Sequence, residues 1–118
     1  PYDLKLVAGD IEYVNRTTQE ILNNVPIEFS LGQNYPNPFN PRTKMKYSLP
    51  RYAEVNITIY NVLGQEVVVL LNKQKEYGYH VISWNGNDEY GKQMASGVYF
   101  ARLTTESFTQ TKKMLLLK

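Results

Sequence analysis

The 118-residue sequence contains no cysteine, one histidine and one tryptophan. Without cysteine the chain has no disulfide bonds, no zinc site built on thiolates and no cysteine nucleophile. A catalytic histidine needs a nucleophile or metal co-ligands close to it. His80 instead lies in a strand-like stretch beside Ile82 and Trp84, which favours a structural or surface role.

Long apolar runs and charge of one sign are scarce as well. The longest apolar run, residues 67–71, is far shorter than the ~20 residues that span a membrane. The formal net charge is +2 and the charges are scattered, whereas a nucleic-acid-binding protein needs a basic patch or stripe. We therefore expect no transmembrane segment and no nucleic-acid partner. Motifs for phosphate binding or hydrolysis are missing too, which predicts a protein that is not an enzyme and uses no cofactor.

The sequence is rich in proline and asparagine over residues 31–41 (LGQNYPNPFNP). Proline fixes φ and lacks an N–H, so this run can be neither a helix interior nor a central strand. Residues before a proline are pushed towards extended conformations. We therefore predict a stiff, extended strap, whose rings Tyr35 and Phe39 dock onto a neighbouring surface. In the simpler interpretation the two rings cover an open edge of the protein's own core.

After this segment, apolar and polar residues alternate with the period of two that is typical of half-buried strands. The predicted strands are residues 43–49, 55–60, 66–71, 79–84, 98–104 and 111–117. We expect 66–71 to be the more fully buried strand, 73–78 to be a polar loop, and Gly64 to take positive φ in the turn before residue 66. Strands spaced by about ten residues indicate an antiparallel sandwich of two sheets.

Residues 1–30 follow a different pattern. Residues 2–8 alternate like a strand, residues 11–15 do so more weakly, and Thr17 with Glu20 would cap a short helix. The chain opens on Pro1 without the basic start of a signal peptide. We interpret residues 1–30 as a linker with one or two strands of a preceding module, in a piece of a longer protein.

Two local features have competing interpretations. Residues 85–91 offer several oxygen ligands, but Tyr90 and Ser96 stand where an EF-hand loop needs Gly and Glu. A turn whose Asn and Asp side chains bond their own backbone is favoured, and an irregular calcium site stays open. Trp84 precedes a glycine turn, where a sandwich usually buries its largest ring; the alternative is an exposed platform for a sugar.

Several motifs follow one another in a distinctive order. They are N-Y-P-N-P-F-N-P at residues 34–41, Y-N-V-L-G-Q-E-V at 60–67, W-N-G at 84–86, S-G-V-Y at 96–99, and a basic pair, apolar strand and terminal Lys at 112–118. This order resembles the type A C-terminal sorting domain of the type IX secretion system of Bacteroidetes, and equally the immunoglobulin-like domain of the flagellar hook-capping protein. The resemblance covers about three-quarters of the chain. Departures are small: Asn61 and Asn85 replace a frequent Asp, and Arg42 a common Ser.

The resemblance implies an all-β, immunoglobulin-like antiparallel β-sandwich of about seven strands over residues 31–118. It also implies a non-catalytic module that directs a larger exported protein, via the periplasm, to the cell surface or medium. The expected partners are the outer-membrane translocon, a surface sortase in some bacteria, and the upstream cargo domain of the same chain. A last strand close to a chain end could be offered to such a partner by edge pairing.

The residues expected to take part in recognition lie in the last strand and in the segment at 96–99. They are Ser96, Gly97, Tyr99, Lys112, Lys113, Met114, Leu115, Leu116, Leu117 and Lys118. The residues expected to build the structural strap are Tyr35, Pro36, Pro38, Phe39 and Pro41. No catalytic, cofactor-binding or metal-binding residue is predicted. Two other functions stay open, namely a structural spacer and a carbohydrate-binding module of a secreted hydrolase that would use Trp84.

Overall fold

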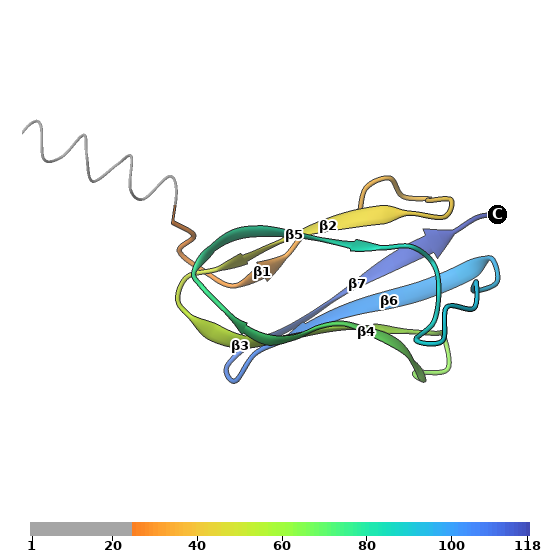
Figure 1. Ribbon diagram of the computed structural model, residues 1–118. Helices are drawn as coiled ribbons and strands as arrows, with labels where there is room; N and C mark the ends of the chain where they lie inside the picture. Colours follow the sequence, from red (N-terminus) through yellow and green to blue (C-terminus); the bar gives the residue numbers. More distant parts are fainter. Residues whose placement is uncertain (1–24) are drawn as a thin grey trace, which may run out of the picture.

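Two antiparallel sheets face each other in a sandwich (Figure 1). The structure is a computed structural model that describes residues 25–118, so the strands and helix predicted before residue 25 lie outside the described residues. Sheet A has the order β1-β2-β5 and sheet B the order β4-β3-β6-β7. The strands are β1 (Ser30–Leu31), β2 (Thr43–Leu49), β3 (Ala53–Tyr60), β4 (Glu66–Lys75), β5 (Gly78–Trp84), β6 (Gly97–Thr104) and β7 (Thr109–Leu116).

The predicted all-β, immunoglobulin-like architecture is confirmed. Compared with a constant-type immunoglobulin domain, the fourth strand pairs with the third rather than with the sheet of the first two. Tyr99 at the start of β6 donates a hydrogen bond from its hydroxyl to the Ala95 carbonyl oxygen over 2.7 Å. That backward bond is the tyrosine corner of immunoglobulin-like sandwiches. Within residues 25–118 no helix is long and apolar enough to cross a membrane.

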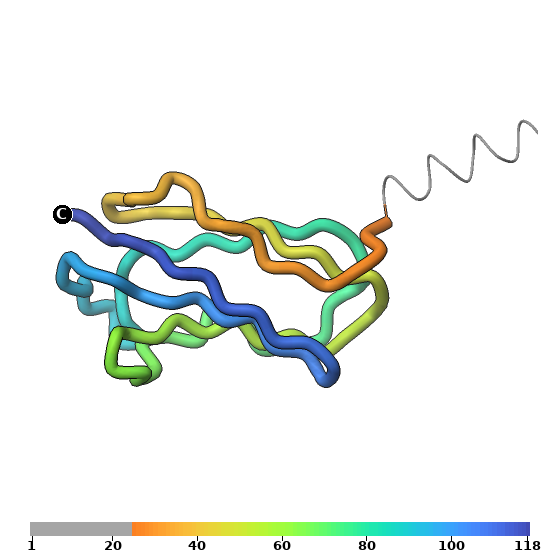
Figure 2. Tube along the Cα trace, turned by 180° about the vertical axis from the view of Figure 1, so that it is seen from behind, coloured from red at the N-terminus to blue at the C-terminus, as the bar shows by residue number. Residues whose placement is uncertain are grey.

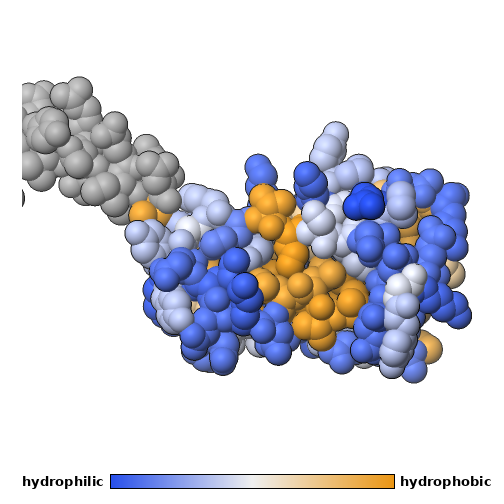
Figure 3. Space-filling view, viewed as in Figure 1, coloured by the Kyte–Doolittle hydropathy of each residue, from blue (hydrophilic) through white to orange (hydrophobic). Residues whose placement is uncertain are grey.

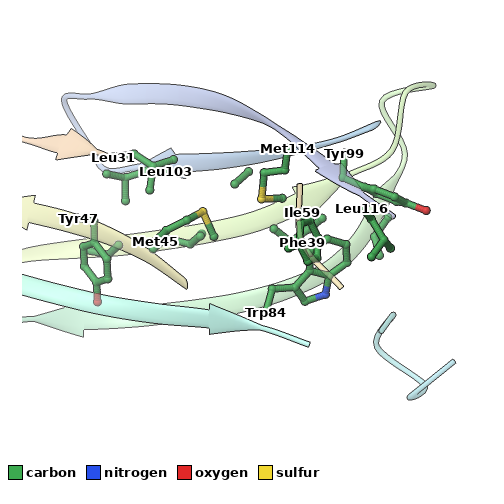
Figure 4. Close-up of a cluster of buried hydrophobic side chains, with 14 of the residues drawn as sticks. Leu31, Phe39, Met45, Tyr47, Ile59, Trp84, Tyr99, Leu103, Met114 and Leu116 are labelled. Atoms are coloured by element: carbon green, nitrogen blue, oxygen red, sulfur yellow. The ribbon is translucent and has the colours of Figure 1, made fainter. Parts of the chain in front are cut away.

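The core lies between the sheets and follows the alternation of the sequence. On β3 every second residue, Val55, Ile57 and Ile59, is almost fully buried. Full burial of such a side chain contributes roughly 1.5–3 kcal/mol to stability. The other core residues are Leu31, Phe39, Met45, Tyr47, Leu49, Ala53, Val67, Trp84, Tyr99, Ala101, Leu103, Met114 and Leu116 (Figure 4). The period-two pattern therefore selects the buried face correctly on β2, β3, β6 and β7.

The prediction for β4 is wrong in two respects. The strand continues to Lys75, where a polar loop was expected, because residues 71–75 pair with the start of β3. It is also not the most buried strand, since Val67 is buried whereas Val69 is 42% exposed. The exposure arises because β4 is an edge strand with two register shifts against β3. Such bulges redirect side chains, so an apolar run need not be a buried strand.

The turn between β3 and β4 has the predicted conformation. Gly64 has a φ of 79°, and Asn61 Oδ1 accepts hydrogen bonds from the backbone N–H groups of Leu63 and Gln65, each over 2.9 Å. An asparagine that bonds backbone groups in this way replaces the hydrogen bonds that the chain loses where the ladder ends. The Y-N-V-L-G-Q motif is thus explained by turn geometry alone.

The two long sides of the sandwich differ. On one side the segment of residues 31–41, here called the strap, lies beside β7 and joins the two sheets (Figure 2). We call it the closed side. On the other side β5 and β4 are the outermost strands of sheets A and B. No further strand among residues 25–118 covers them, and we call it the open side.

Candidate recognition surface

The strap bends rather than running straight. Asn34 and Thr43 are buried, and their side chains meet, with Asn34 Nδ2 donating to Thr43 Oγ1 over 2.9 Å. Both side chains also donate to the carbonyl oxygen of Pro36, over 3.0 Å from Asn34 and 2.9 Å from Thr43. These three bonds fold residues 34–43 into a closed loop. The prediction of an extended strap is therefore wrong, because side-chain bonds that the backbone preferences do not reveal decide its path.

The two aromatic rings of the strap have opposite surroundings. Phe39 is 2% exposed and its ring centroid lies 5.5 Å from that of Trp84. Trp84 in turn packs against Tyr99, with ring centroids 5.3 Å apart and planes at 65° (Figure 4). Tyr35, by contrast, is 82% exposed. The expectation that both rings dock is correct for Phe39 and wrong for Tyr35, which pairs with β2 through its backbone only.

The strap pairs with the final strand along its outer edge. The Phe39 N–H donates to the Leu115 carbonyl oxygen and the Leu117 N–H donates to the Phe39 carbonyl oxygen, both over 3.0 Å. The Leu115 N–H donates to Asn37 Oδ1 over 3.1 Å, and Gln33 Nε2 donates to the Lys113 carbonyl oxygen over 2.7 Å. The strap therefore satisfies the backbone groups that an edge strand would otherwise expose.

This pairing corrects the picture of a free terminal strand. Between residues 113 and 117 the outer edge of β7 is occupied by the strap, so a partner cannot add a strand there while the strap is in place. Met114 and Leu116 are fully buried, whereas Lys113, Leu117 and Lys118 are exposed. In the folded domain a partner can therefore contact this segment mainly through its exposed side chains.

The two segments that the sequence singled out lie side by side. In the β6–β7 ladder Gly97 pairs with Leu116 and Tyr99 pairs with Met114. The Lys118 N–H donates to Ser96 Oγ over 2.9 Å, which ties the last residue to the segment before β6. Lys112 is half-buried and shares the inward register of Met114. These residues thus form one continuous region at the end of the sandwich that carries the C-terminal residue (Figure 1).

The W-N-G motif places a glycine against the strap. Gly86 has a φ of 81°, and a Cβ at this position would lie 3.0 Å from the carbonyl oxygen of Pro41. Only glycine avoids both the left-handed strain and this overlap. The motif is therefore explained by the close approach of the loop to the end of the strap.

The rest of the loop after β5 bonds to itself. Asp88 Oδ1 accepts hydrogen bonds from the N–H groups of Tyr90 and Lys92, over 2.9 and 2.8 Å. Asn85 Oδ1 accepts one from the Asn87 N–H over 3.0 Å. This agrees with the favoured interpretation of a self-bonded turn. Among residues 25–118 there is no group of three or more His, Asp or Glu side chains that could hold a metal ion.

Trp84 and His80 have structural surroundings. Trp84 is 1% exposed, and its Nε1–H donates to the Asn87 carbonyl oxygen over 2.9 Å. Its ring has no open face for a sugar, so the expectation of a buried Trp84 is confirmed. The His80 ring stacks on Tyr47 with centroids 5.0 Å apart, and its Nε2 lies 2.9 Å from the Glu76 carbonyl oxygen.

Burial raises the pKa of Tyr47 and of Tyr99 above the ordinary value of 10.0.

Sequence reasoning missed the polar residues that position the strap. Asn34, Thr43, Asn37 and Gln33 make the bonds described above, and Gln110 Oε1 accepts a hydrogen bond from the Leu31 N–H over 2.8 Å. The only signal in the sequence was the repeated asparagine between prolines. Asparagine bonds nearby backbone groups readily, but its partners on β7 are nearly eighty positions away.

A comparison with protein families identifies the fold family. The model of the FlgD Ig-like domain matches residues 39–107. The chain belongs to the FlgD Ig-like domain family. The matched residues run from the ring that anchors the strap to the turn between β6 and β7, so the family membership covers most of the sandwich. The search of curated proteins found no match.

A comparison with solved structures found matches to parts of two larger proteins. Dimeric latent PorU from Porphyromonas gingivalis matches 76% of this chain with a TM-score of 0.62 and 20% identity. PorZ, described as an essential bacterial surface component of the type-IX secretion system of the same organism, matches 76% with a TM-score of 0.49 and 20% identity. The chain covers only 9% and 11% of these two proteins. At 20% identity the match to PorU shows a likeness of fold alone.

Proposed function

We propose that this Ig-like domain is a non-catalytic C-terminal sorting module that directs a larger exported protein through the type IX secretion system to the cell surface or medium. The observation that carries the proposal is spatial. The sequence motifs of the sorting-domain resemblance meet at one end of the sandwich, where Phe39, Trp84 and Tyr99 pack together and Leu116 completes the cluster (Figure 4).

A single packed cluster joins the strap to the final strand, which gives a translocon one rigid surface to recognise. Exposed side chains of this surface, Lys113, Leu117 and Lys118, are available without unfolding. The outer-membrane translocon and, in some bacteria, a surface sortase are the proposed partners. The resemblance to part of PorU supports the fold of such a module, and the motif order in the sequence supports the sorting role.

The experiment is an export assay with a reporter. All 118 residues are fused behind a periplasmic signal peptide and a fluorescent protein, and the fusion is expressed in a type IX-competent host and in the same host without its translocon. We expect the reporter outside the cell only in the competent host. A triple substitution of Lys113, Leu117 and Lys118 by alanine should reduce export, whereas Glu54→Ala at an exposed position of β3 should not. A reporter that stays in the periplasm of both hosts would instead indicate a structural spacer.

A further inference from the structure

The open side of the sandwich has room for one more strand. Sheet A has three strands and sheet B has four, so a fourth place beside β5 lies opposite β4. An apolar surface lies there in the centre of the view of Figure 3. Its exposed member on β4 is Val69, whose side chain is 42% exposed. Half-buried Val68, Leu70, Leu71 and Ile82 continue it towards the core.

The backbone of β5 presents unpaired groups towards this place. Lys46 directs its backbone groups to β1, since its carbonyl oxygen accepts the Gly32 N–H over 2.8 Å. Successive residues of an antiparallel strand direct their backbone groups to opposite sides. Met45 and Tyr47, on either side of Lys46, therefore bond to β5, where they pair with Ile82 and His80. The N–H and C=O groups of Tyr79, Val81 and Ser83 consequently point away from β2. No backbone partner for them occurs among residues 25–118.

The two outermost strands of the open side are not equivalent as templates. The β4 strand has two register shifts, and its Val67 carbonyl oxygen already accepts the Glu89 N–H over 3.3 Å. The β5 strand pairs with β2 over seven residues in unbroken register and contains no proline or lysine. Bulges, proline and lysine are the features that protect an edge from pairing. Strand addition therefore fits β5.

The space beside β5 has an apolar wall on the side of β4. A hollow of about 450 Å³ lies between the two outermost strands. One wall is Val68, Val69 and Leu70 of β4. The end of β5 with Ser83 and Trp84 forms another, and the rest of the lining is polar or glycine: Arg42, Asn85, Asn87, Asp88, Glu89 and Gly91. Because side chains alternate across a strand, every second residue of an added strand would point towards β4. The residues that face Val68 and Leu70 of β4 and Ile82 of β5 must therefore be apolar.

The outer face of sheet A is cationic. Strands β1, β2 and β5 contain no Asp or Glu. Lys44 and Lys46 are exposed on β2, directly opposite Ser83 and Val81 in the ladder with β5. Lysine side chains are long enough to reach across β5. The outward residues of an added strand would therefore lie close to the positive charges of Lys44 and Lys46. Charge complementarity requires those residues to be acidic.

We propose that the free edge of β5 binds an extended segment of another protein chain, in which acidic and apolar residues alternate, as a fourth strand of sheet A. Backbone hydrogen bonds to Tyr79, Val81 and Ser83 supply the pairing, as in other cases of strand addition. The apolar residues cover β4, and the acidic residues face Lys44 and Lys46. This binding concerns the opposite side from the strap, so it does not rest on the proposed sorting role.

The first experiment uses the full chain and a soluble seven-residue peptide of alternating glutamate and valine. We expect the peptide to shift the amide NMR signals of Tyr79, Val81 and Ser83. Val81→Pro removes an N–H that points away from β2, so the sheet is kept, and the affinity should fall at least about tenfold, equivalent to 1.4 kcal/mol. Val81→Thr keeps the N–H and should retain binding. A peptide whose N–H groups along the edge facing β5 are replaced by N-methyl groups gives the same test on the unsubstituted protein, because it cannot form the backbone hydrogen bonds and should bind more weakly.

The second experiment tests the charge rule. Lys46→Glu should weaken binding of the glutamate–valine peptide and strengthen binding of a lysine–valine peptide. The proposal is overturned if the glutamate–valine peptide does not bind, or if Val81→Pro or N-methylation leaves its affinity unchanged. It is equally overturned if light scattering shows a dimer that Val81→Pro dissociates, because a second copy of the chain would then occupy the edge.

Discussion

The closed and open sides of the sandwich solve the same problem in different ways. Each side ends in strands whose outer backbone groups need partners. On the closed side, the strap supplies those partners to Leu115 and Leu117 of the final strand segment. On the open side, β5 keeps its outward groups without partners among residues 25–118. A proline-rich segment with few backbone donors of its own can thus protect an edge, because the backbone of Phe39 and the side chains of Gln33 and Asn37 do the bonding.

The difference also concerns what anchors each side. The strap is held by a buried ring, a buried polar pair and a glycine contact, all at one end of the sandwich. On the open side no further segment among residues 25–118 pairs with the free edge of β5. Substitutions on the closed side should therefore cost stability, and those on the open side should change binding.

The largest expected effect concerns the ring that anchors the strap. Phe39→Ala should lower the free energy of unfolding by about 3–5 kcal/mol, because it empties the space beside Trp84. Tyr35→Ala, in the same strap, should change it by less than about 0.5 kcal/mol, since the ring is 82% exposed. Urea denaturation of both variants measures the contrast. Equal costs would show that the strap is not held by Phe39.

Next in size is a comparison of two glycines of the same loop. Gly86 and Gly91 have φ values of 81° and 84°, so alanine at either position should cost about 1–2 kcal/mol of left-handed strain. Only at Gly86 would the new Cβ meet Pro41, which should add about 1–3 kcal/mol. Thermal or urea unfolding of the two variants isolates the contact between loop and strap. A Gly86→Ala variant no less stable than Gly91→Ala would argue against that contact.

A smaller effect is expected at the hydrogen bonds of the closed edge. Asn37→Ala removes the acceptor of the Leu115 N–H. The lost hydrogen bond should cost about 1 kcal/mol of local stability and so speed hydrogen exchange of the Leu115 amide with solvent about fivefold. Exchange at Leu117, which is bonded to Phe39, should change less. The amides of Tyr79, Val81 and Ser83 should exchange quickly in both proteins. Slow exchange at these three would contradict the free edge of β5.

The smallest effect is on the pH dependence of stability. Because burial raises the pKa of Tyr47 and Tyr99 in the folded state, the folded protein holds these phenol protons more tightly than the unfolded chain. Their contribution is fully present below pH 10 and is lost as the pH rises through the raised values. Tyr47→Phe and Tyr99→Phe should each flatten the fall in stability above pH 10. Only Tyr99→Phe should also lower stability at neutral pH, through the lost bond to Ala95.

The sequence predicted the elements whose causes are local. Alternation on β3 and β6 identified the buried residues, and Asn61 with Gly64 identified a turn, because neighbours in the chain decide both. It failed on β4, where an apolar run suggested burial and bulges at a sheet edge produced exposure. It failed again on Tyr35 and Phe39, which look alike in the sequence and differ only in what lies next to them.

For this protein the sequence alone determined the all-β class, six of the seven strands and the place of its single tryptophan in the core. Those features follow from the alternation of apolar and polar residues, from the turn-forming residues and from the size of the tryptophan ring. Each of these can be recognised within a few neighbouring residues. The tertiary structure alone decided which edges are covered. The strap reaches the final strand across nearly eighty positions, and β5 remains open because sheet A is one strand narrower than sheet B. Contacts of such sequence separation depend on how the two sheets pack, and no local pattern contains them.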